Sequence, residues 1–136
     1  MDGTARVKCL PIALKAIGLF YIFGVYPMML WAWPTGWGKI PPYHEFQLIG
    51  LALYATLGVY LILAGRNLAA NIGLIWFTIS VNLVCGTTML VMMVANRVEM
   101  VNWAGNISVQ YLIAGILWYL MPRNVKLLQR LDSESK

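Results

Sequence analysis

The sequence predicts an all-α membrane protein, a bundle of four antiparallel transmembrane helices with both termini in the cytoplasm. Of its 136 residues, 60% are hydrophobic and only 11% are charged, whereas a soluble domain carries about 25% charged residues. Residues 71–95 contain no charged residue. A helix of that length is about 37 Å long and can cross a hydrocarbon core about 30 Å thick. We therefore expect one membrane domain over residues 1–136.

Polar or turn-forming residues divide the apolar sequence into four segments. The predicted spans cover residues 10–31, 46–65, 71–95 and 100–121, and a cytoplasmic tail covers 122–136. Gly65-Arg66-Asn67 is typical of such a break, because it combines a helix-ending glycine with a charge. The basic start followed by an apolar run looks like a secretion signal. No small-residue cleavage pattern ends that run, so we expect a retained first helix, with Pro11 in its first turn.

The distribution of Lys and Arg predicts the orientation. Eight of them fall on the side that holds both termini, and two fall on the other side. The eight are Arg6, Lys8, Lys15, Arg66, Arg123, Lys126, Arg130 and Lys136, and the two are Lys39 and Arg97. Because positive residues stay on the cytoplasmic side, this bias predicts that both ends are cytoplasmic. It also explains the net charge of +5 without a nucleic-acid partner.

Polar residues recur on one face of the third predicted span. Thr78 and Asn82 are followed by Cys85 or Gly86, Met89 and Met93, at steps of three or four residues. In the fourth span, Asn106 and Gln110 are four residues apart and share a face. An Asn in a membrane needs a hydrogen-bonding partner, so we expect Asn82 to pair with Gln110. We call Thr78, Asn82, Asn106 and Gln110 the polar seam.

The polar seam has two interpretations. It either holds the helices in register or lines a solute pathway. Transport pathways usually contain an ionisable residue within the membrane. The only charged residue inside the predicted spans is Lys15, close to one end. We therefore favour the packing role, and a proton-coupled exporter lacks its membrane-embedded carboxylate.

Methionines gather towards the outer face and provide the candidate metal ligands, which are His44, Met92 and Met93. Thioether and imidazole ligands suit copper(I). Met is also an ordinary packing residue in apolar bundles, and no Met-x-Met or His-x-His spacing is present. We therefore expect no metal and no cofactor, and keep copper as an alternative.

Catalytic residues are not indicated. In Tyr43-His44-Glu45 the imidazole and the carboxylate are adjacent, so on a helix they point about 100° apart and form no dyad. Tyr54 is the remaining acid–base candidate. Cys9 and Cys85 belong to no Cys-x-x-Cys motif, and their predicted depths in the membrane do not favour a disulfide. We expect a protein that is not an enzyme.

Aromatic residues are frequent, with six Trp and seven Tyr. Most are explained as anchors in the membrane–water interface. The predicted anchors are Trp31, Trp33, Trp37, Trp103 and Trp118. An aromatic-lined slot for a lipid, quinone or pigment remains a second explanation.

Several runs resemble a known family. LYATLGVYLILAGRN (53–67), GLIWFT (73–78), and Gly86 with Met89 are similar to an uncharacterised family of short bacterial four-helix membrane proteins, a domain of unknown function. YPMMLWAWPTGW (26–37) and LMPR (120–123) fit the same pattern. The resemblance implies the four-helix fold and a bacterial inner-membrane location, and it implies no activity.

The residues therefore favour a non-enzymatic integral membrane protein, an accessory or structural subunit of a larger membrane complex. Its expected partners are the lipid bilayer and other membrane subunits. The alternative is a small membrane carrier or binder of an apolar ligand (lipid, quinone or pigment) or of copper.

Overall fold

The computed structural model describes residues 3–31, 44–96 and 100–121, which contain helices and no strand. The elements are α1 (Gly3–Leu19), η1 (Phe20–Gly24), α2 (Val25–Trp31), α3 (His44–Ala64), α4 (Ile72–Asn96) and α5 (Met100–Leu120). Because α1, the π-helical turn η1 and α2 follow one another without a break, the described chain forms four helices. The prediction of an all-α fold is confirmed.

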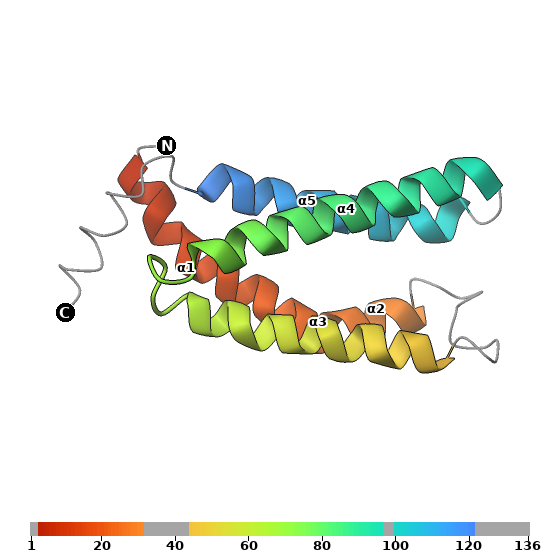
Figure 1. The fold of residues 1–136 in the computed structure, drawn as a ribbon, viewed down its shortest axis with the longest axis horizontal. Helices are drawn as coiled ribbons and strands as arrows, with labels where there is room; N and C mark the ends of the chain where they lie inside the picture. The colour runs from red at the N-terminus through yellow and green to blue at the C-terminus, as the bar shows by residue number, and fades with distance from the viewer. Residues whose placement is uncertain (1–2, 32–43, 97–99, 122–136) are drawn as a thin grey trace.

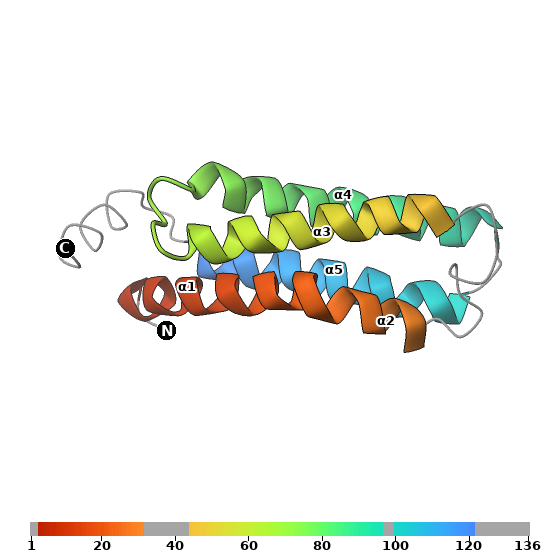
Figure 2. The ribbon, with the colours of Figure 1, turned by 90° about the horizontal axis from the view of Figure 1, so that it is seen from below.

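The helices form two hairpins. One hairpin pairs the first helix with α3, and the other pairs α4 with α5 (Figure 1). The hairpins meet mainly where α1 contacts α5, whereas α3 and α4 barely touch, although they are consecutive in the sequence. Figure 2 shows α1 and α5 side by side in the turned view. The start of α1 and the end of α5 lie at the same end of the molecule (Figure 1).

Two glycines let α1 and α3 approach closely. A Cβ atom on Gly18 would lie 2.6 Å from the Gly58 carbonyl oxygen, and a Cβ on Gly58 would lie 2.6 Å from the Gly18 carbonyl oxygen. Only residues without a side chain fit this crossing, which brings the two backbones together. By contrast, the space around Gly50 in the same helix α3 is empty.

A short turn joins the hairpins. α3 ends where Gly65 N–H donates to the Leu61 carbonyl at 3.1 Å. Asn67 then stabilises the turn, because its Oδ1 accepts from Ala70 N–H at 3.1 Å and its carbonyl accepts from Asn71 Nδ2 at 2.8 Å. The Asn71 carbonyl accepts from the Ile75 N–H at 3.2 Å and so begins the bonding pattern of α4.

The hydrophobic core lies towards the end of the molecule that contains this turn. In the first helix, the buried residues follow each other at steps of three or four and form one stripe. They are Leu10, Leu14, Ile17, Tyr21 and Val25. The core is completed by Leu61 of α3, by Ile75 and Ile79 near the start of α4, and by Ile113, Ala114, Leu117 and Leu120 near the end of α5. The hairpins are therefore packed together at one end.

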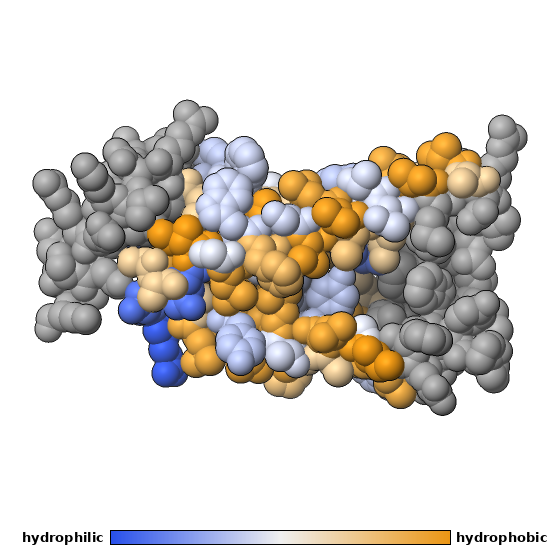
Figure 3. Space-filling view, viewed as in Figure 1, coloured by the Kyte–Doolittle hydropathy of each residue, from blue (hydrophilic) through white to orange (hydrophobic). Residues whose placement is uncertain are grey.

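Two helices are long and apolar enough to cross a membrane, Lys8–Met28 and Ile72–Ala95. Shorter apolar helices cover Leu48–Ala64 and Asn106–Leu120. Large apolar side chains cover much of the outside of the bundle (Figure 3). Together these features agree with a protein that associates with a membrane.

The helix ends lie close to the predicted spans, with one difference. α3, α4 and α5 begin and end within two residues of the segments 46–65, 71–95 and 100–121. The first helix starts earlier, at Gly3, so Pro11 lies inside α1 and not in its first turn. A proline inside a helix removes one backbone donor and crowds the carbonyl four residues earlier, which favours a helix start at Pro11, yet the residues before it are helical as well.

Candidate functional site

A buried polar contact joins the two hairpins near their middle. The Tyr21 hydroxyl donates to Asn82 Oδ1 at 2.9 Å and accepts from Asn82 Nδ2 at 2.7 Å. Asn82 Nδ2 also donates to the Thr78 carbonyl at 2.8 Å. Tyr21 is 2% exposed and Asn82 is 1% exposed. The polar atoms of both side chains are thus satisfied within the protein, as burial requires.

The π-helical turn η1 helps to orient Tyr21. Tyr21 is the second of its five residues, Phe20–Gly24. A π turn contains one residue more than an α turn, so it rotates the following residues relative to the preceding ones. Gly24 closes the turn, and a Cβ atom there would collide with the Phe20 ring. Gly24 therefore accommodates a side chain of its own helix.

Two further groups surround this contact. The Tyr54 ring of α3 packs against Tyr21 edge to face, with ring centroids 5.3 Å apart and an interplanar angle of 65°. The Cys85 thiol of α4 is half-buried and interacts with Tyr54. We call Tyr21, Tyr54, Asn82 and Cys85 the central cluster. It takes residues from three helices and contains no charged side chain.

A second polar group lies where α4 meets α5, beyond the central cluster. Asn106 Nδ2 donates to Met89 Sδ at 3.0 Å, and Gln110 Nε2 approaches the same sulfur at 3.7 Å. Gln110 is 4% exposed, and its Oε1 atom is buried with no hydrogen-bond partner among the described residues. We call Met89, Asn106 and Gln110 the amide–thioether group. It is incompletely hydrogen-bonded, because a thioether is a weak acceptor.

The structure corrects the expected pairing in the polar seam. Thr78, Asn82 and Gln110 are buried, and Asn106 is half-buried. Asn82 does not pair with Gln110, however, since its amide bonds to Tyr21 and the Thr78 carbonyl. The reason is geometric. α4 faces the first helix at Asn82 and faces α5 one to two turns later, at Gly86 and Met89.

The sequence patterns did not identify Tyr21 as a residue of the site. It lies four residues after Ile17 on the buried stripe of the first helix, so its burial could have been inferred from the spacing. Its role as the partner of Asn82 could not, because that depends on which helices are neighbours. Tyr54 was considered as an acid–base residue, and it lies in the central cluster.

The predicted anchors are only partly described. Trp118 is 60% exposed and packs edge to face on Trp76 of α4, with ring centroids 5.4 Å apart. Trp31 and Trp103 belong to α2 and α5, but their side chains lie outside the described part. Trp33 and Trp37 lie outside the described residues.

The candidate metal ligands are not brought together in the described part. Met93 is half-buried on α4, whereas the side chains of His44 and Met92 are outside it. Among the described residues, no three His, Cys, Asp or Glu side chains form a group that could hold a metal ion. Copper remains a prediction without a structural counterpart.

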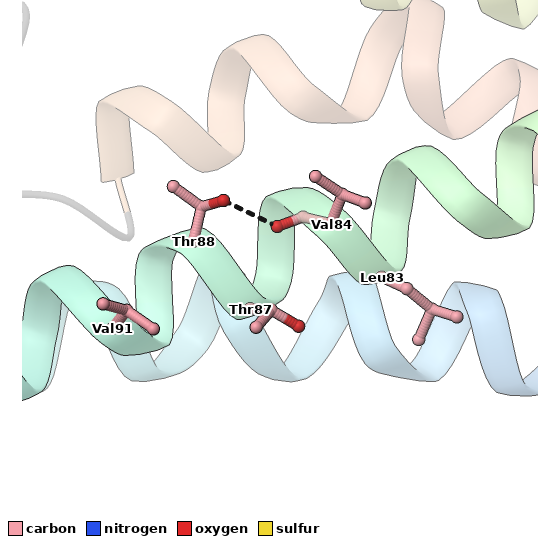
Figure 4. Close-up of a pocket in the computed structure, with 5 residues that line it drawn as sticks. All are labelled: Leu83, Val84, Thr87, Thr88 and Val91. Atoms are coloured by element: carbon pink, nitrogen blue, oxygen red, sulfur yellow. Dashed lines mark hydrogen bonds between the residues drawn. The ribbon is translucent and has the colours of Figure 1, made fainter.

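A shallow groove of about 430 Å³ runs along the outer face of α4. Its lining is mostly apolar, and consists of Leu83, Val84, Thr87, Thr88 and Val91 (Figure 4). The hydroxyls of both threonines are already bonded within the protein. Thr88 Oγ1 donates to the Val84 carbonyl at 2.9 Å, and Thr87 Oγ1 lies 3.0 Å from the Tyr111 hydroxyl. The groove therefore suits an apolar occupant.

Comparison with known proteins gives one match. The model of a protein family described as a family of unknown function (DUF6632) matches residues 4–134. Neither the curated proteins nor the solved structures include a match.

Proposed function

The chain belongs to DUF6632, a family of unknown function, and we propose that it is a non-enzymatic integral membrane protein that serves as an accessory subunit of a larger membrane complex. In this proposal all four helices cross the membrane, and both termini are cytoplasmic. The hairpin arrangement supports this topology, because the start of α1 and the end of α5 lie at one end (Figure 1). The eight-to-two distribution of Lys and Arg supports the orientation.

The observation that carries the subunit role is the outer face of α4. Val84, Val91 and Val94 are each more than 60% exposed, and the groove of about 430 Å³ lies beside the first two. Helices associate in membranes through shape and small or polar residues, since lipid removes the hydrophobic driving force. The groove gives this helix face a shape that another helix can pack into. Its two threonine hydroxyls already have hydrogen-bond partners, so the partner helix need not supply any. We propose that a helix of a partner subunit occupies it.

Site-specific photocrosslinking tests this role. A photoreactive residue at Val84 or Val91 should form an adduct with one defined larger protein in the membranes that naturally contain the chain. The matched control is Ile12, which is 68% exposed on α1. Its adducts should be with lipid only.

The result can also contradict the role. If Val84 and Val91 yield lipid adducts only, or if the uncrosslinked protein migrates alone on a native gel after extraction in mild detergent, the chain is not a subunit of a stable complex.

A further inference from the structure

One acceptor of the amide–thioether group, Gln110 Oε1, lacks a donor among the described residues. Within the part of the chain that the structure describes, Gln110 Oε1 is buried and accepts no hydrogen bond, while Asn106 Nδ2 and Gln110 Nε2 share one sulfur, Met89 Sδ, at 3.0 and 3.7 Å. Leaving a buried carbonyl oxygen unpaired costs about 1–3 kcal/mol. Rotating the Gln110 amide by half a turn does not remove this cost, because its oxygen would then face the sulfur, which is itself an acceptor.

The missing partner must be able to donate and accept at the same place. It must donate to Gln110 Oε1, and it satisfies the amide N–H groups better than a thioether if it also accepts from them. A hydroxyl does both. The site carries no charge, since Met89, Asn106 and Gln110 are all neutral, so a phosphate or an ammonium group does not match it.

The two hairpins are loosely joined between α3 and α4. Their buried core gathers towards the end that contains the 65–71 turn, and α3 and α4 barely touch. Figure 3 shows a recess between the layer of α4 and the layer of α2 and α3, with a small strongly hydrophilic patch inside it. Met89, which is half-buried, has an unbranched side chain that can move aside.

Apolar residues border this recess above and below in Figure 3. An occupant that reaches the amides with a polar head would therefore lie along apolar surface with the rest of its length.

We propose that the amide–thioether group binds the hydroxyl of an apolar amphiphile, such as a long-chain alcohol, whose hydrocarbon part lies between the two hairpins. The hydroxyl donates to Gln110 Oε1 and accepts from the Asn106 and Gln110 amides in place of Met89 Sδ. This site is separate from the outer groove of α4 and does not depend on the subunit role. A water molecule offers the same hydroxyl chemistry, and the experiment distinguishes the two.

The test compares two photoreactive probes that differ in one group. One is a long-chain alcohol with a diazirine in its chain, and the other is the alkane of equal length with the same diazirine. Both are added to the purified chain in mild detergent, and the labelled peptides are identified by mass spectrometry. One gained hydrogen bond should let the alcohol label α4 and α5 near Met89 at about five- to tenfold lower concentration than the alkane.

A variant pair assigns the effect to Gln110. Gln110→Met keeps a similar volume and should abolish the difference between alcohol and alkane. Leu112→Met, on the exposed face of α5, should preserve it. If Gln110→Met does not fold, the comparison on the unmodified chain still decides. Equal labelling by both probes would mean that only water or another group of the chain satisfies Gln110, and would overturn the proposal.

Discussion

At the residue scale, the contact between Tyr21 and Asn82 is the clearest link between the two hairpins. It is buried, its hydrogen bonds are 2.7 and 2.9 Å long, and it joins residues 61 positions apart. Interhelical hydrogen bonds in membrane proteins contribute about 0.6–2 kcal/mol each. The larger effect comes from breaking one side of the pair, because the remaining group is then buried without a partner.

Removing the Tyr21 hydroxyl should therefore destabilise the fold. We expect Tyr21→Phe to lower the free energy of unfolding by about 1–3 kcal/mol, because Asn82 loses its side-chain partner. Asn82→Leu should have a similar effect, because it leaves the Tyr21 hydroxyl unpaired. Unfolding by a denaturing detergent, followed by circular dichroism, measures both.

A double variant and a control complete this experiment. Tyr21→Phe with Asn82→Leu should cost less than the sum of the two single changes, since neither partner is left unpaired. Tyr26→Phe, at a tyrosine that is 53% exposed, should change the stability by less than about 0.5 kcal/mol. Strictly additive losses would show that the contact contributes nothing specific.

At the element scale, the crossing of α1 and α3 depends on having no side chain at Gly18 and Gly58. The carbonyl oxygen of each glycine lies 2.6 Å from the position that a Cβ atom on the other glycine would occupy. Backbone atoms cannot move aside as a flexible side chain does. The crossing is therefore sensitive to one added methyl group.

Two alanine substitutions in α3 separate this effect from helix propensity. Gly58→Ala should destabilise the protein by about 1–3 kcal/mol, because the helices must move apart. Gly50→Ala, where nothing lies within 4 Å, should be neutral or stabilising by up to about 1 kcal/mol, because Ala favours a helix. Equal effects at the two positions would refute the close crossing.

Sequence patterns predicted the helices and their buried faces better than they predicted which helices pack against each other. The spacing of Thr78, Asn82 and Gln110 indicated one buried face on each helix, and all three side chains are buried. Local spacing carries no information about which faces meet. That is why Asn82 was assigned to Gln110 and not to Tyr21.

The central cluster also depends on a feature that spacing cannot reveal. A π turn differs from an α turn by one residue in its hydrogen-bonding pattern, and apolar residues such as those of Phe20–Gly24 fit both. The separation of α3 from α4 is likewise set by the α1–α5 and α1–α3 contacts, which form between residues distant in the sequence.

At the scale of the whole molecule, the two hairpins are joined at one end and separate towards the other. The buried apolar residues gather near the 65–71 turn, and α3 hardly contacts α4. This asymmetry is the basis of the proposed amphiphile site between the hairpins, whereas the groove lies on the outer face of α4 and does not depend on it.

The proposed topology has a direct test. Cys9 is exposed, and in a variant with Cys85→Ser it is the only thiol. A reagent that cannot cross membranes should leave Cys9 unmodified in intact cells and modify it after permeabilisation. Asn67→Cys, introduced with Cys9→Ser and Cys85→Ser, should behave in the same way, and Arg97→Cys in that background should react in intact cells. Modification of Cys9 in intact cells would reverse the orientation.

The π turn of the first helix also bears on how the chain tolerates a change of length. Because it contains one residue more than an α turn, losing a single residue from Phe20–Gly24 restores a regular helix. The turn takes up its extra residue locally, so the helix on either side keeps nearly the same orientation, and Tyr21 and Val25 can both stay on the buried stripe. Loss of one residue here should therefore disturb the bundle less than loss of one residue from an α-helical stretch, which rotates the residues beyond it by about 100°.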